Sequence, residues 1–197
     1  MKQNNYQDVL DFWFEGEPLG ELQMSRWWKK DLEQDELIAD KFGYLVERIY
    51  SGECDKWLQT AEGRLAAIIC LDQFPRNIFR GSGQSFAYDE KALELSLAGV
   101  AAGHLEQLDN LRQPFFIMPM MHSEKSSVQE QCVELFEKLV ADSDSIFQKS
   151  LKNNLDFAIR HRDIVLRYGR FPHRNELLQR RSSPEELAFL SRPGSSF

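Results

Sequence analysis

Apolar residues recur at intervals of three and four along most of the chain, which is the spacing of one face of an α-helix. The clearest examples run from residue 31 to 50 and from residue 128 to 140. The longest predicted helix begins at residue 143 or 144 and continues to Tyr168. It ends at Gly169, because glycine readily adopts the left-handed backbone that often closes a helix.

Capping residues and helix breakers mark the other elements. Asn5 or Asn4 precedes a first apolar stripe, and Thr60 and Asp89 are positioned to cap two further helices. Pro75 is expected to end the helix that Thr60 opens, since proline removes a backbone donor.

The remaining prolines give one clear prediction and one ambiguous segment. Residues 183–186, with the sequence SPEE, form a capping box with proline at the first helical position, which predicts a last helix to Leu190. Pro114 and Pro119 break up the apolar residues 114–121, and within residues 104–123 we expect a short helix and a buried turn.

No segment shows the alternation of apolar and polar residues that is typical of a strand. The pattern therefore predicts an all-α protein of eight or nine helices joined by short loops, many of them as antiparallel pairs. The chain of 197 residues, 42% of them hydrophobic, can build one substantial core. We expect a single domain over residues 1–197, with a frayed tail at about 192–197.

Composition narrows the setting of the protein. The three cysteines are far apart and form neither a disulfide framework nor a zinc motif, so we predict a cytoplasmic protein without a metal or cofactor. The N-terminal residues lack the apolar core of a signal peptide. The longest apolar runs are far below the roughly twenty residues of a membrane span, so no membrane association is expected.

The charge of the chain is unevenly distributed. The net charge of −7 argues against general binding to nucleic acid. Residues 160–181 nevertheless contain seven arginines and only two acids. Arginine is suited to bidentate pairing with carboxylate or phosphate. These arginines either pair with acids elsewhere in the chain or bind an anion, and both interpretations stay open.

Helical phase separates the charged residues at the end of the longest helix. His161 shares an apolar stripe with Phe157 and Ile164, and Arg162 also has mainly apolar helical neighbours, so both are expected to face protein. Asp163 belongs instead to a stripe of alternating charge that is typical of a solvated surface. A structural hydrogen bond and a functional role are both compatible with His161.

Asp72 stands on the same predicted helix face as apolar residues, which is unusual for an acid. A buried carboxylate needs a cation or several donors. Arg76 is four residues away, and Arg162, Arg170 and Arg174 are further possible partners. Asp72 is therefore either part of a structural ion pair or an acid inside a pocket.

Two similar motifs, FPRN at residues 74–77 and FPHRN at 171–175, each follow a helix end. Their Arg and Asn side chains, or the free N–H groups of a new helix, would suit an anion. The motif MHSE at residues 121–124 adds His122 after a kinked apolar segment. The histidine spacings match no metal motif, which supports the prediction of no metal.

Several longer sequence motifs resemble those of a known family. LDQFPRNIFRG at 71–81, MHSE at 121–124, HRDIVLRYGRFPHRN at 161–175 and SSPEELAFL at 182–190, with FWF and RWW near the start, resemble the bacterial family catalogued as "domain of unknown function 924". The resemblance covers almost the whole chain. Its visible departure is Ser183, where the family commonly has Thr. The resemblance implies a TPR-like array of antiparallel helix pairs and no established reaction.

The same residues emerge from the motifs and from the resemblance. The predicted ligand-binding residues are Asp72, Gln73, Arg76, Asn77, His122, His161, Arg162, Arg170, His173, Arg174 and Asn175. The first hypothesis is a polar cleft that binds a small anionic molecule. If it supports chemistry, His161 or His173 would be the acid or base and Asp72 its orienting partner.

The second hypothesis is a TPR-like interaction module that binds a protein or peptide in an open groove. A third is an internal ion-pair network without a ligand. A closed pocket with converging charges would favour the first hypothesis, and an open groove would favour the second.

Overall fold

The structure is a computed structural model that describes residues 5–195, and within this range it is all-α and contains no strand. Its α-helices are α1 (Tyr6–Trp13), α2 (Glu21–Trp28), α3 (Leu32–Tyr50), α4 (Ala61–Asp72), α5 (Phe74–Ile78), α6 (Asp89–Ala101), α7 (Gln113–Met121), α8 (Ser126–Asp142), α9 (Gln148–Tyr168) and α10 (Pro184–Leu190). Four short 3-10 helices join them: η1 (Asp55–Gln59), η2 (Gly83–Phe86), η3 (Leu105–Gln107) and η4 (Pro172–Arg174). The all-α prediction is confirmed. The helix that Thr60 opens ends at Asp72, and Pro75, which was expected to end it, lies instead in the first turn of α5.

Most predicted helix ends are found where the capping chemistry placed them. Asn5 forms a capping box at the start of α1, and the side chains of Thr60 and Ser183 accept backbone N–H groups at the starts of α4 and α10. Gly169 closes α9 with a positive φ of 69°. The alternative cap Asn4 and the tail residues 196–197 lie outside the described residues.

The start of α9 differs from the prediction. We expected it at residue 143 or 144, whereas α9 begins at Gln148. Ser143 instead donates its hydroxyl to the carbonyl of Val140 and so closes α8, and the N–H of Asp144 binds the side chain of Asn110. The side chain of Ser143 thus closes α8 instead of capping a new helix, and the N–H of Phe147 binds the carbonyl of Asp144 in a turn before α9.

Pro119 was expected to break up this segment, whereas α7 continues through it. Proline removes the bond to the carbonyl four residues earlier, at Phe115, and usually weakens a helix. All nine residues of α7 are buried. Burial of the whole helix, rather than helical propensity, therefore holds this segment in a helix.

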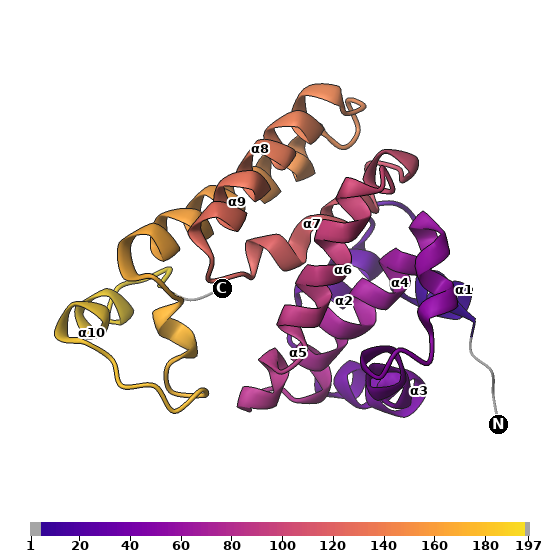
Figure 1. Ribbon diagram of the computed structural model, residues 1–197. Helices are drawn as coiled ribbons and strands as arrows, with labels where there is room; N and C mark the ends of the chain where they lie inside the picture. The colour runs from indigo at the N-terminus through magenta and orange to yellow at the C-terminus, as the bar shows by residue number, and fades with distance from the viewer. Residues whose placement is uncertain (1–4, 196–197) are drawn as a thin grey trace.

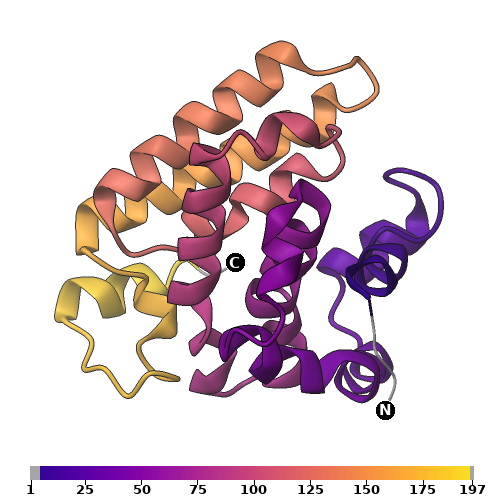
Figure 2. The ribbon, with the colours of Figure 1, turned by 45° about the vertical axis from the view of Figure 1, so that its right-hand side comes forward.

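Helix α4 is the centre of the core, and ten of its twelve residues are buried. Helices α1, α3, α6 and α7 pack around it. Helices α8 and α9 form a long antiparallel pair on one side of this core, and α7 contacts both members of the pair as well as α4 (Figure 1). Figure 2 shows the same pair from a second direction, with the C-terminal segment at one end of it. The end of α4 thus lies near α7 and α9.

A second, smaller apolar cluster holds the C-terminal segment. Ile164, Val165 and Phe171 are buried together, and Tyr168 and Phe189 pack against them, so α10 folds over the end of α9. The tail that we predicted to fray is hydrogen-bonded as far as Ser195, whose hydroxyl donates to the carbonyl of Leu190 at 3.0 Å.

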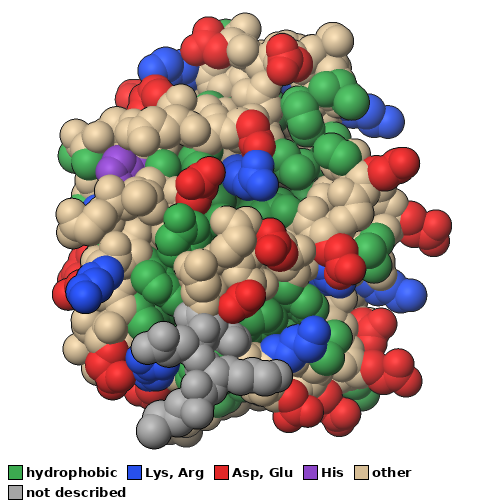
Figure 3. Space-filling model, turned by 90° about the vertical axis from the view of Figure 1, so that its right-hand side faces the viewer, with side chains coloured by type: hydrophobic (Ala, Val, Ile, Leu, Met, Phe, Trp, Pro, Cys, Tyr) green, Lys and Arg blue, Asp and Glu red, His purple; other side chains and the backbone are tan. Residues whose placement is uncertain are grey.

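The surface is strongly mixed in charge. Figure 3 shows one face, on which acidic side chains are scattered among basic and apolar ones. None of the helices in residues 5–195 is both long enough and apolar enough to span a membrane.

Two helical glycines give a matched test of the packing. A Cβ at Gly99 would lie 2.4 Å from the Phe116 ring, whereas a Cβ at Gly43 would meet only Ile78, at 3.9 Å. We expect Gly99→Ala to destabilise the protein by about 1–3 kcal/mol through overpacking. Gly43→Ala should stabilise it by about 0.5–1 kcal/mol, because alanine favours the helix. Urea unfolding of both variants measures these changes, and equal signs would contradict the packing described here.

Candidate functional site

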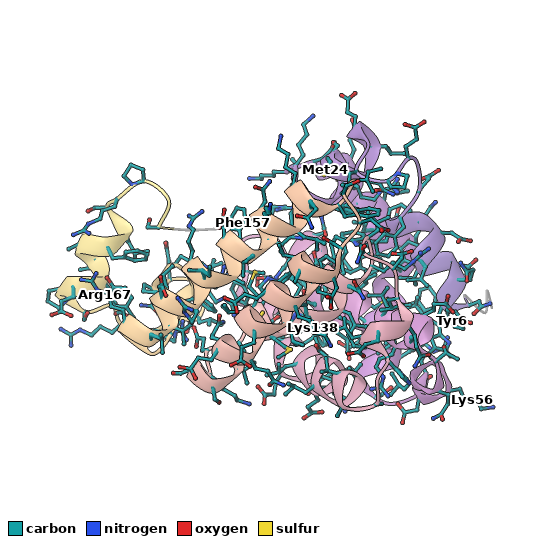
Figure 4. The ribbon with its side chains drawn as sticks, turned by 90° about the horizontal axis from the view of Figure 1, so that it is seen from above. Tyr6, Met24, Lys56, Lys138, Phe157 and Arg167 are labelled. Carbon is teal, nitrogen blue, oxygen red and sulfur yellow. The ribbon has the colours of Figure 1, made fainter. Side chains whose placement is uncertain are left out.

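A cavity of about 750 Å³ lies between α2, α5, α7, α9 and the segment around η4. Its lining includes five cations (Lys29, Lys30, Arg76, Arg80 and Arg174) and three histidines (His122, His161 and His173). Six aromatic residues also line it: Trp27, Trp28, Phe86, Phe115, Phe147 and Phe157. The size is typical of a site for a small organic ligand. In Figure 4, Met24 of α2 and Phe157 of α9 lie on the same side of the molecule, and both line the cavity.

Seven of the eleven predicted site residues line this cavity: Gln73, Arg76, Asn77, His122, His161, His173 and Arg174. Asp72 lies directly behind them, fully buried. Three predicted residues, Arg162, Arg170 and Asn175, are not brought into the cavity.

Asp72 occupies the last position of α4 and is paired with His122 at the end of α7. The distance from Asp72 Oδ1 to His122 Nδ1 is 2.7 Å, and Gln73 donates its side-chain amide to Oδ2. Arg76 lies 3.4 Å from the carboxylate. Burial by itself would raise the pKa of Asp72, but Arg76, His122 and Gln73 hold it well below its usual range.

This pairing corrects one predicted role. We expected Asp72 to orient His161 or His173, whereas it orients His122. An ionised carboxylate at Nδ1 favours the tautomer with the proton on that nitrogen, so Nε2 is the basic atom of His122. Burial and then Arg76 lower the pKa of His122, which outweighs the opposite effect of Asp72. His122 is therefore neutral near pH 7.

The arginines of the two Phe-Pro motifs bind the same carboxylate. Arg76, from FPRN, binds Asp89 with two hydrogen bonds of 2.9 and 3.1 Å, and Arg174, from FPHRN, binds Asp89 Oδ2 at 3.0 Å. Asp89 was predicted as a helix cap, whereas Tyr88 is the cap and Asp89 is the first residue of α6. Its pairing with two arginines was missed, because nothing in its local sequence shows which distant cations fold onto it.

Arg174 is held between two aromatic rings. Its guanidinium carbon lies 4.5 Å from the centroid of Phe86 and 4.7 Å from that of Phe171, and the residue is 7% exposed. Burial lowers the pKa of Arg174 to about 10, so it is still charged near neutral pH. Two rings and one carboxylate fix the orientation of this cation before any ligand binds.

The other two histidines of the cavity, His161 and His173, are neutral near pH 7. The Nδ1 atom of His161 lies 2.7 Å from the carbonyl of Phe157, and a carbonyl only accepts, so Nδ1 carries the proton. Burial, followed by the proximity of His122, lowers the pKa of His161 to about 3. Burial and the neighbouring Arg174 lower the pKa of His173 to about 4.

The remaining predicted residues have other contacts. Arg162 pairs with its neighbour Asp163 at 2.7 Å and is half-buried on α9, so the expectation that it faces protein is met only in part. Arg170 binds Glu186 of α10 with bonds of 2.7 and 2.8 Å, and Asn175 bonds to Ser182. These contacts close the C-terminal segment rather than the cavity.

Some residues at the cavity were not among the predicted ones. Arg80 binds Asp35 through two nitrogens, at 2.6 and 2.8 Å, and Asn77 donates to the same carboxylate at 2.7 Å. Lys29 and Lys30 lie at the exposed end of α2. The adjacent Trp27 and Trp28 at the end of α2 both line the cavity.

Within residues 5–195, no group of three or more His, Cys, Asp or Glu side chains is arranged to hold a metal ion. What the cavity offers is fixed guanidinium donors, neutral imidazoles and an Asp–His pair. Such groups bind anions and accept protons.

The sequence profile described as "Bacterial protein of unknown function (DUF924)" matches residues 9–194. The chain belongs to this family. A solved structure is similar to this DUF924 chain: that of a protein of unknown function, ATU0120, from Agrobacterium tumefaciens, with a TM-score of 0.81 and 34% sequence identity. The similarity covers 94% of this chain and 96% of that one. A comparison with curated proteins finds no match. The predicted family resemblance is confirmed.

The low pKa values of the buried histidines predict acid lability. Unfolded histidines have a pKa near 6.5, so the unfolded chain binds more protons than the folded one between about pH 6.5 and the folded values near 3 and 4. Stability should be full above this window and fall as the pH decreases through it, by about 1.4 kcal/mol per pH unit for each histidine. Urea unfolding between pH 7.5 and 4.5 measures the slope. His161→Gln and His173→Gln should each reduce it, and unchanged slopes would refute the assignment.

Proposed function

We propose that this protein binds a small anionic molecule, such as a carboxylate or phosphate compound, in the cavity. The observation that carries the proposal is the charge of the lining, which contains five Lys and Arg residues but no Asp or Glu among the described residues. This contrasts with a chain whose net charge is −7.

The acids that pair with the cavity arginines support the proposal through their position. Asp35, Asp72 and Asp89 contact Arg80, Arg76 and Arg174 but do not line the cavity themselves. Counting these three acids against the five cations leaves two positive charges in excess. An anion would therefore meet positive groups first, with the compensating carboxylates behind them.

The arginines are also prepared for binding. Arg76 uses three of its five N–H donors on Asp72 and Asp89, and Arg174 uses one on Asp89, so each retains donors for an anion. Because ion pairs and rings already restrict both side chains, little further conformational entropy is lost when a ligand binds.

The Asp72–His122 pair adds acid/base capacity to this proposal. A buried carboxylate at Nδ1 orients the ring and stabilises the imidazolium formed when Nε2 accepts a proton. His122, rather than His161 or His173, is then the proton acceptor of the site.

A second candidate is a protein or peptide interaction module, as the TPR-like description of the family implies. It is supported by exposed apolar side chains at the cavity rim, where Trp28 is 52% exposed and Phe157 is 43% exposed. The TPR-like arrangement itself is an analogy of fold and gives weaker support than the charge of the lining.

Anion binding is tested by isothermal titration with inorganic phosphate, acetate and citrate. Arg174→Gln should weaken the binding of the probe that wild type binds best by roughly tenfold or more, because a charged hydrogen bond is lost. Arg162→Gln is the matched control, since Arg162 lies outside the cavity, and its affinity should equal that of wild type.

A second variant protects this test against misfolding of Arg174→Gln. Lys29 and Lys30 are exposed at the rim, so the double variant Lys29→Glu, Lys30→Glu should fold normally and bind the anion several-fold more weakly at low salt. Binding that survives both the arginine change and the charge reversal would refute the proposal.

The proton acceptor is tested by NMR titration of the histidine side chains. Asp72→Asn should lower the pKa of His122, because the negative charge that favours the imidazolium is removed. His104, which lies beside Arg64 and outside the cavity, serves as an internal control and should titrate unchanged. A pKa of His122 that does not respond to this change would contradict the pairing.

A further inference from the structure

Two helix faces form long walls of the cavity. On α7 and its cap, Pro114, Phe115, Met118, Met121 and His122 line it, with the three- and four-residue spacing of one helix face. On α9 and just before it, Phe147, Ser150, Asn154, Phe157 and His161 line it with the same spacing. Each wall is therefore a continuous stripe and not a single point of contact.

The two walls run in the same direction. Near their starts, the N–H of Asp144 binds Asn110 at 3.1 Å, and at their ends the rings of His122 and His161 are 6.2 Å apart. The histidines and the paired arginine lie at this second end, where Asp72 pairs with His122 and Arg76. From Pro114 to His122 the helix rises roughly 12 Å, at about 1.5 Å per residue.

On the α7 side the first part of this length is apolar, and on α9 Ser150, Asn153 and Asn154 follow Phe147. Phe115 packs with Trp27 at a ring distance of 4.8 Å and is stacked with Trp28 at 6.1 Å with an angle of 14° between the rings. Met118 and Phe157 continue the apolar wall toward the histidines. The cavity volume of about 750 Å³ far exceeds the roughly 30 Å³ of one water molecule. A free carboxylate or phosphate ion, which has only a few heavy atoms, would therefore leave this wall without contacts.

We infer that the ligand is an amphipathic anion, with a carboxylate or phosphate head at Arg76 and Arg174 and an apolar chain or ring along α7 and α9 toward Trp28. This inference rests on the proposed anion-binding function and adds the chemical class of the ligand. The exposed Trp28 and Phe157 then belong to the apolar half of the ligand site. A peptide would satisfy the apolar wall but would need a free carboxylate to satisfy the arginines.

The test is isothermal titration of the full chain with unbranched alkyl carboxylates and alkyl phosphates of increasing length, from acetate and inorganic phosphate to decanoate and decyl phosphate, below their micelle concentrations. Unbranched alkanols serve as neutral probes. Affinity should rise about fourfold for each added methylene until the apolar wall is covered. Each anion should bind at least roughly tenfold more tightly than the alkanol of equal length.

A pair of variants on one helix locates the chain of the ligand. Phe157→Ser changes an exposed cavity residue of α9, and Leu166→Ser changes a residue of α9 that is 53% exposed and outside the cavity. Phe157→Ser should weaken decanoate or decyl phosphate by about tenfold or more without changing the binding of inorganic phosphate. Leu166→Ser should change neither.

The outcomes separate the two proposals. Equal affinity for short and long anions, or binding of inorganic phosphate alone, overturns the amphipathic ligand and leaves the anion site intact. Alkanols that bind as tightly as the anions overturn the anion site and keep the apolar wall. No binding of any probe overturns both. Capture of an apolar peptide without a free carboxylate, while no alkyl probe binds, also overturns both and supports an interaction module.

Discussion

The ion pairing of Asp89 with Arg76 and Arg174 is the contact on which the cavity depends. Arg76 lies in α5, in the first half of the chain, and Arg174 lies in η4, in the segment that folds back after α9. One carboxylate with two guanidinium partners therefore joins both sides of the cavity. Because the charges are partly buried, loss of any one of the three would leave an imperfectly paired charge, which is costly inside a protein.

Helical periodicity and capping chemistry were sufficient to predict the fold class and most helix ends. They failed where tertiary contacts decide. Pro119 stays helical because all residues of α7 are buried in the fold, and α9 begins late because Ser143 closes α8 and the N–H of Asp144 binds Asn110. Local sequence describes propensity, but these two outcomes depend on neighbours that are distant in the chain.

The candidate site was predictable in composition and less so in pairing. The oddly placed Asp72 correctly indicated a buried carboxylate with donors, yet its imidazole partner, His122, is 50 residues away. For Arg162, helical phase indicated a face of α9 but not whether another element covers it. At this end of α9, Leu166 on the same side is exposed, and Arg162 stays at the surface.

The contact between Asp89 and Arg174 spans 85 residues, and it also has a consequence for how the protein acquires its site. Contacts of such long sequence separation form late, because closing a long loop costs conformational entropy. During synthesis the core around α4 is complete well before residue 174 emerges, so a nascent chain carries the half-site of Arg76 and Asp89 with one arginine missing. The order of the chain therefore delays the closed cavity until almost the whole protein has been made.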